Sequence, residues 1–159
     1  KANIFRHEYE AIEDALVQVV RFTPDLKIEG ETDITAYPAL VTAGKGACDA
    51  SSFPMLQELA ELIGGTLACS RPVVEAGLMP YERQVGQTGK TVAPKLYIAV
   101  GVSGAIQHFV AIQGAEKIVA INSDENAPIF QEADVGIVGD YQKIVPILIE
   151  RLKDKMGGS

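Results

Sequence analysis

The sequence predicts an α/β domain with a doubly wound, Rossmann-like parallel sheet. Short apolar runs recur from residue 38 onward and alternate with segments whose apolar residues have helical spacing. Strands that are apolar on both faces belong in a parallel sheet covered by helices on both sides. Because crossovers between parallel strands are right-handed, such an alternation winds helices onto both faces of one sheet.

The first half of the repeating pattern contains two strands and two helices. Leu56, Leu59 and Ile63 recur on one helix face, and Gly64 stops that helix. Pro72 suits the first turn of a helix. The predicted elements are a strand at 39–43, a helix at 53–63, a strand at 66–69, a short helix from Pro72 to near Gly77 and a loop at 80–94.

The second half continues the alternation, and its strand at 96–100 is the clearest in the chain. The turn at 101–104 is tight because it holds two glycines. The predicted elements are that strand and turn, a helix at 105–112, a strand at 117–121 ending at Asn122, a helical turn at 127–132, a strand at 135–138 and a helix at 144–156.

Residues 1–36 have no decisive pattern. Ile12, Leu16 and Val19 fit a helical stripe, whereas the β-branched run up to Phe22 fits a strand. We therefore expect residues 1–36 to be a linker or strand segment belonging to a preceding region, residues 37–156 to be the ligand-binding domain and residues 157–159 to be a tail.

Composition narrows the class of function. The net charge of −7 argues against nucleic-acid binding, because an acidic surface repels phosphate backbones. No apolar stretch reaches the ~18 residues of a membrane helix, so we expect no membrane insertion. Cys48 and Cys69 have neither CxxC nor zinc spacing, which favours reduced thiols, no metal site and a cytoplasmic location.

Glycine and polar residues follow every predicted strand, at what becomes one edge of the sheet. The turn at 101–104 leads into a helix, where free amides and Ser103 could hold a pyrophosphate. Asn122 lies 21 positions after Gly101, where dinucleotide folds place a residue that contacts the ribose. Ser103 replaces the second glycine of GxGxxG, so an ordinary strand–helix turn remains the alternative.

Two other motifs are incomplete. The segment 86–91 resembles a phosphate-binding loop, but Gln84 stands where a Walker sequence needs glycine. The segment 101–105 resembles a nucleophile elbow, but Ala105 replaces its last glycine. ATP hydrolysis is therefore disfavoured, and a serine hydrolase with Ser103 as nucleophile stays a minor alternative.

Four strings resemble the electron transfer flavoprotein alpha subunit. They are QVGQTGK at 84–90, LYIAVGVSGAIQH at 96–108, and VAIN at 119–122 with APIFQ at 127–131. The second string is close to the signature of that family. The similarity extends over about residues 38–152, and it suggests a strand and linker for 15–37.

The resemblance implies FAD as the cofactor and gives roles to matched positions. The pyrophosphate would be wrapped by Ser103, Gly104, Ala105, Ile106, Gln107 and His108, with His108 reaching the O2 side of the flavin. The ribityl chain and ring edge would contact Val85, Gly86, Gln87 and Thr88, and Gln84 would also bind the cofactor. Ser70 and Arg71 would cover the ring, and Asn122, Asp140 and Tyr141 would lie at the adenosine end. Lys45 stands where the family often has arginine.

The resemblance also implies a function. The chain would be the C-terminal domain of an alpha subunit that forms a heterodimer with a beta subunit, in the cytoplasm or, in a eukaryote, the mitochondrial matrix. It would carry electrons from flavoprotein dehydrogenases to a membrane-linked or other acceptor through an FAD semiquinone and hydroquinone, with no substrate-converting chemistry. Arg71 and His108 would supply positive charge beside the flavin. A nucleotide-binding module without redox turnover is the alternative.

Overall fold

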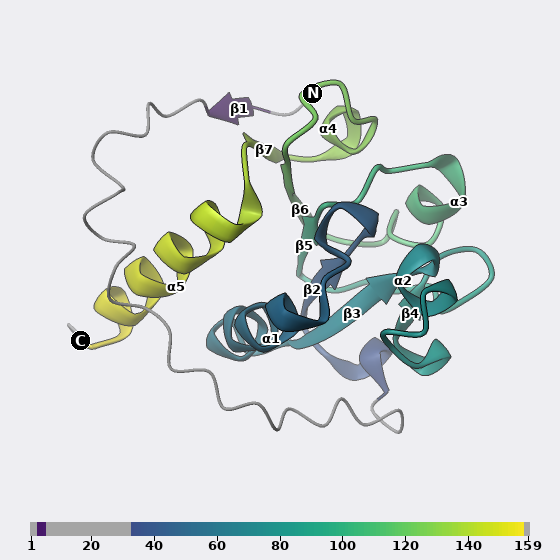
Figure 1. Ribbon diagram of the computed structural model, residues 1–159, viewed down its shortest axis with the longest axis horizontal. Helices are drawn as coiled ribbons and strands as arrows, with labels where there is room; N and C mark the ends of the chain where they lie inside the picture. The colour runs from purple at the N-terminus through teal and green to yellow at the C-terminus, as the bar shows by residue number, and fades with distance from the viewer. Residues whose placement is uncertain (1–2, 6–32, 158–159) are drawn as a thin grey trace.

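The computed structural model describes residues 3–5 and 33–157. Its sheet is entirely parallel, with the order β1-β7-β6-β5-β2-β3-β4 (Figure 1). The strands are β1 (Asn3–Phe5), β2 (Ala39–Ala43), β3 (Thr66–Ser70), β4 (Gln84–Val85), β5 (Leu96–Val100), β6 (Lys117–Asn122) and β7 (Val135–Val138). The α/β, doubly wound prediction is confirmed.

Helices cover both faces of the sheet. They are α1 (Phe53–Leu62), α2 (Arg71–Glu75), α3 (Ile106–Phe109), α4 (Ile129–Glu132) and α5 (Tyr141–Gly157), with 3-10 turns at Ile34–Ala36, Lys45–Ala47, Ala50–Ser52 and Tyr81–Arg83. The packed helices α1 and α5 lie on one face, and α3 and α4 lie toward the other (Figure 1). Each face has its own core of buried apolar side chains, which explains why the strands read as continuous apolar runs.

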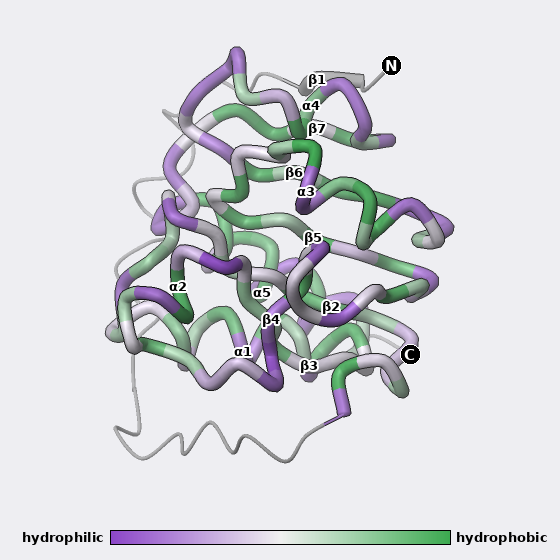
Figure 2. Tube along the Cα trace, turned by 90° about the vertical axis from the view of Figure 1, so that its right-hand side faces the viewer, coloured by the Kyte–Doolittle hydropathy of each residue, from purple (hydrophilic) through white to green (hydrophobic). Residues whose placement is uncertain are grey.

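Alternate residues of each strand enter the two cores. In β2, Val41 packs with Leu56 and Leu59 of α1, whereas Leu40 packs on the opposite face with Tyr97 of β5. Hydrophilic stretches lie mainly in the peripheral loops (Figure 2). The sheet is therefore a rigid middle layer whose strand ends hold the loops in place.

The strand order reverses between β2 and β5. From β2 the chain builds outward through β3 to β4, then returns to β5 on the other side of β2 and continues outward through β6 and β7. In open α/β sheets the crevice outside such a switch point is the usual ligand site. The loops that follow β2, β3, β4 and β5 all lie at this edge.

A close backbone contact joins the loops after β2 and β5. The amide of Gly44 donates to the Val100 carbonyl at 2.8 Å, and the amide of Gly46 donates to the Gly101 carbonyl at 2.9 Å. Gly101 has a φ of +65°, and a Cβ there would lie 2.5 Å from the amide nitrogen of Ala47. Glycine is therefore required here both for backbone conformation and for space.

Most element boundaries agree with the sequence prediction, and two helices differ. The helix expected at 105–112 is a single turn, because Ala111 and Ile112 donate three residues back and the Ala111 carbonyl accepts from Val92. The last helix begins at Tyr141 instead of 144, because the Asp140 side chain accepts from the Gln142 amide and caps it.

The sequence did not predict two of the strands, and one predicted segment lies outside the residues that the structure describes. The two-residue strand β4 lies within the predicted loop at 80–94, and β1 pairs in parallel with β7 at the edge of the sheet. The ambiguous helix or strand predicted near residues 12–22 lies outside the described residues.

Candidate functional site

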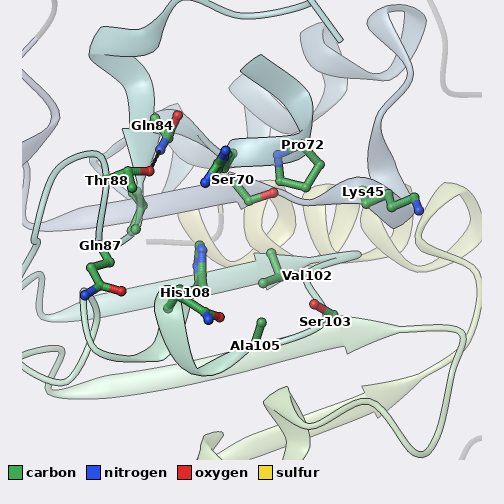
Figure 3. Close-up of a pocket in the computed structure, with 14 residues that line it drawn as sticks. Lys45, Ser70, Pro72, Gln84, Gln87, Thr88, Val102, Ser103, Ala105 and His108 are labelled. Carbon is green, nitrogen blue, oxygen red and sulfur yellow. Dashed lines mark hydrogen bonds between the residues drawn. The ribbon is translucent and has the colours of Figure 1, made fainter. Parts of the chain in front are cut away.

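A pocket of about 290 Å³ opens at the switch point, beside the ends of β2, β3, β4 and β5 (Figure 3). Gln84 and Thr88 lie toward one end, Lys45 lies at the other, and His108 and Val102 lie between them. The pocket is lined by Lys45, Ser70, Arg71, Pro72, Gln84, Val85, Gly86, Gln87, Thr88, Val102, Ser103, Ala105, Gln107 and His108. Most of the predicted site residues therefore share one cavity.

The pocket is locally cationic in an acidic chain. Lys45 and Arg71 line it, and no carboxylate belongs to the described residues that form its wall. Arg71 Nε lies 2.7 Å from Glu75 Oε1, in an exposed ion pair along α2. Exposed pairs of this kind contribute little, so the guanidinium can be redirected toward an anionic ligand at small cost.

The turn after β5 presents backbone donors. Within the described part of the chain, the amides of Ser103, Gly104 and Ala105 donate no hydrogen bond. The Ser103 carbonyl accepts from the Ile129 amide at 2.9 Å, which fixes the turn against α4. Adjacent free amides form a suitable contact for phosphate oxygens. Because α3 is only one turn long, this contact depends on the amides themselves more than on a helix dipole.

The segment 84–90 folds into a closed loop. The Lys90 amide donates to the Gln84 carbonyl at 2.7 Å, and Gln84 Nε2 donates to Thr88 Oγ1 at 2.9 Å. The Gln87 amide donates to the Gln107 carbonyl at 2.8 Å, so the loop is attached to α3. No helix follows this loop directly, as a Walker motif would require, and the structure agrees with excluding one.

His108 lies in the pocket wall but is itself buried. Its Nε2 is 2.6 Å from the hydroxyl oxygen of Tyr97, which lies beneath it in β5. Burial lowers the pKa of His108 to about 4, although a hydrogen bond to the Val85 backbone acts in the opposite direction. The imidazole is therefore neutral at pH 7 in the unliganded pocket, so the positive charge predicted there comes from Arg71 and Lys45.

This arrangement also bears on the serine hydrolase alternative. A hydrolase needs a histidine hydrogen-bonded to the nucleophilic hydroxyl. The Nε2 atom of His108 is paired with Tyr97, and the nearest hydrogen-bond partner of its ring besides that is the Val85 backbone. The geometry of a nucleophile and base is therefore not formed between Ser103 and His108.

Stability should depend on pH through His108. Its folded pKa of about 4 lies below the ordinary value of 6.5, so the unfolded chain binds more protons between these values. The free energy of unfolding should therefore fall as pH decreases from 6.5 to 4, by roughly 3 kcal/mol. When the free energy of unfolding is measured with urea across this pH range, it should fall less steeply with decreasing pH for His108→Gln than for the wild type. If it falls equally steeply in both proteins, the low pKa of His108 is contradicted.

Five predicted residues do not line the pocket. Asn122 Nδ2 donates to the Val102 carbonyl at 3.0 Å and its Oδ1 accepts from the Asp124 amide, so this side chain braces the turn after β5. Asp140 caps α5, and the Tyr141 hydroxyl lies 2.9 Å from Ser52 Oγ. Gly104 lies in the turn itself, with φ +81°, and Ile106 is 71% exposed on α3.

Two lining residues were missed from the sequence. Val102 is buried within the turn after β5, and Pro72 lies in the first turn of α2 beside Arg71. Both are apolar residues with no chemical signature. Their positions next to predicted residues, Ser103 and Arg71, were the only available signal.

Fold and site together define a doubly wound, Rossmann-like domain with a cationic pocket at its switch point. A family model described as the electron transfer flavoprotein FAD-binding domain matches residues 33–113. The chain therefore belongs to the electron transfer flavoprotein alpha family.

Curated relatives agree with this membership. Protein FixB of Bradyrhizobium diazoefficiens is 45% identical over 98% of this chain and 42% of its own length. The mitochondrial electron transfer flavoprotein subunit alpha of Arabidopsis thaliana is 42% identical over 98% of this chain and 43% of its own. That of Dictyostelium discoideum is 48% identical over 81% of this chain and 36% of its own. The chain thus spans about two fifths of these relatives.

In residues 3–5 and 33–157, none of the helices combines the length and the apolar character needed to cross a bilayer.

Proposed function

We propose that this chain binds FAD in the switch-point pocket and forms the FAD-binding domain of an electron transfer flavoprotein alpha subunit. The observation that carries the proposal is one cavity formed by the loops after four adjacent strands, all within or next to the family match. In that cavity, cations and free amides face a space without carboxylates. An anionic dinucleotide is the ligand that such a wall favours.

The lining residues would contact different parts of the cofactor. The free amides of the turn after β5, with the Ser103 hydroxyl, would hold the pyrophosphate. The loop 84–88 and Val102 would contact the ribityl chain and ring edge, and Ser70 and Arg71 would lie over the ring. Gly104 and Ile106 would belong to the pyrophosphate turn. Asn122, Asp140 and Tyr141 would act at the adenosine end, beyond the pocket wall.

When bound, the flavin supplies the electron-carrying chemistry, and the protein orients it and sets its electrostatic surroundings. Residues 37–156 would form the FAD domain, with residues 1–36 joining it to a preceding region. In the intact protein a beta subunit would complete the heterodimer, and flavoprotein dehydrogenases would deliver electrons that pass to a separate acceptor. The chain itself would convert no substrate.

The first test is reconstitution. The purified chain is incubated with FAD, desalted, and examined for a retained flavin absorbance spectrum and for reversible reduction and reoxidation. At a hundredfold excess over Kd, FAD should raise the free energy of unfolding by about 2.7 kcal/mol. Failure to retain FAD would overturn the proposal. Retention of ADP with no affinity for the flavin would indicate a nucleotide-binding module without redox turnover.

Arg71 provides a test of the electrostatic role. A cation beside the flavin stabilises the negative charge that reduction adds, so Arg71→Ala should lower the reduction potential. Arg71 is 62% exposed and solvent screens it, so the expected change is on the order of tens of millivolts. A spectroscopic redox titration of the FAD-loaded chain measures it.

The matched control for Arg71 is Lys95→Ala. Lys95 is an exposed cation outside the pocket wall, and its removal changes the net charge of the chain by the same amount. The Lys95 variant should keep the wild-type potential. If both variants shift the potential equally, the effect comes from the overall charge and Arg71 has no specific role.

A further inference from the structure

A buried polar contact lies directly behind the pocket. Tyr97 is completely buried in β5, and its hydroxyl oxygen is 2.6 Å from Nε2 of His108. The two rings are tilted by 53°, with centroids 6.1 Å apart, so the contact is a hydrogen bond made by their edges. Tyr97 does not line the pocket, and its hydroxyl has no part in the binding roles described above.

The direction of this hydrogen bond follows from the burial of the Tyr97 hydroxyl. Buried polar groups of proteins are nearly always hydrogen-bonded. Nε2 of His108 lies at hydrogen-bond distance from this hydroxyl, so the O–H group is expected to donate to it. A neutral imidazole has only one N–H, so a ring that accepts at Nε2 carries its proton on Nδ1.

Thr42 supports the same direction. It lies on β2 two residues after Leu40, the register partner of Tyr97, so Thr42 and Tyr97 share one face of the sheet. Its Oγ1 is fully buried and makes no hydrogen bond within the described part of the chain, so it does not accept from the Tyr97 hydroxyl. Burial raises the pKa of Tyr97, so the phenol keeps the proton that it donates to His108.

We propose that Tyr97 is a positioning residue for the pocket: its hydroxyl donates to Nε2 of His108 and holds the imidazole as the neutral tautomer with its proton on Nδ1. Nε2 is then engaged by the protein. His108 meets a ligand as an oriented, uncharged ring, and the charges that face it across the pocket are those of Arg71 and Lys45.

The consequence for cofactor binding rests on the proposed function, whereas the tautomer does not. Tyr97→Phe keeps the buried ring and removes only the donor. Because His108 then loses one hydrogen bond of ordinary strength, its ring should shift. The Kd for FAD should rise about fivefold as a result. The tautomer can be measured on the chain without FAD, so the two ideas can fail separately.

The experiment is nitrogen NMR on the full chain labelled at histidine, at neutral pH. The chain has two histidines, and a His7→Gln variant assigns their signals. In the wild type, Nδ1 of His108 should carry the proton and Nε2 should have the shift of a hydrogen-bonded acceptor. In Tyr97→Phe, the Nε2 signal should move away from that position, and the Nε2-protonated tautomer should gain population.

Two results would overturn the proposal. One is a wild-type His108 whose proton resides on Nε2, and the other is an unchanged His108 signal in folded Tyr97→Phe. The wild-type spectrum is decisive even if the variant fails to fold. Tyr37→Phe, which removes a tyrosine hydroxyl outside the pocket wall, should leave His108 unchanged. Retention of the Nδ1 tautomer without FAD binding would sustain the proposal and refute the flavin function alone.

Discussion

Replacing Gly101 with alanine should lower the free energy of unfolding by about 3 kcal/mol and lower Tm by on the order of 10 °C. Two causes add together. Gly101 has a φ of +65°, which costs alanine about 1 kcal/mol. In addition, a Cβ would lie 2.5 Å from the Ala47 amide nitrogen and 2.6 Å from the Gly46 carbonyl carbon. Backbone atoms cannot move aside as the end of a side chain can, so the loops after β2 and β5 must separate.

That separation should also impair the pocket. The Gly46 amide donates to the Gly101 carbonyl at 2.9 Å, and both loops contribute to the wall through Lys45 and Ser103. FAD binding should therefore weaken more than the loss of stability alone explains. Urea denaturation gives the stability change, and fluorescence titration of FAD gives the affinity.

Gly64→Ala is the matched control for this prediction. Gly64 has a similar φ of +75°, but a Cβ there would meet nothing within 4 Å. It should cost only the conformational part, about 1 kcal/mol, and leave FAD binding intact. If the two variants were equally stable, the close approach at Gly101 would have no energetic consequence.

Most strands, and the edge of the sheet at which they end, were predictable because a strand buried on both faces is a continuous run of apolar residues. Leu96 to Val100 and Ile118 to Ile121 contain no charged residue. The two-residue strand β4 is too short to form such a run, and its pairing with Cys69 and Ser70 is determined by the tertiary fold. Likewise, β1 is specified by an open edge at β7 and not by any pattern of its own.

Pocket-lining residues were predictable where backbone geometry or charge placed them at a strand end, as for Ser103 and Arg71. His108 lines the pocket as expected, but the positive charge expected on it disagrees with the lowering of its pKa by burial, which depends on residues distant in sequence such as Tyr97. Asn122 had the expected spacing, yet its amide is used internally by Val102 and Asp124. Spacing can position a side chain, but only the folded structure determines which partners it has.

Placing a tryptophan at position 105 should block the pocket without unfolding the protein. Ala105 lines the cavity and is exposed, so a larger side chain meets no buried neighbour and Tm should change little. The indole would occupy much of a cavity of about 290 Å³ that a ligand must enter. In Ala105→Trp, we therefore expect the Kd for FAD to rise at least about a hundredfold, a loss of some 2.7 kcal/mol.

The control for this variant is Ala76→Trp, at an exposed position that follows α2 and lies outside the pocket wall. The chain has no native tryptophan, so each variant carries one indole whose fluorescence reports on its surroundings. FAD should bind Ala76→Trp with wild-type affinity. Undiminished binding to Ala105→Trp would mean that FAD occupies another part of the molecule, since a ligand cannot share this cavity with an indole.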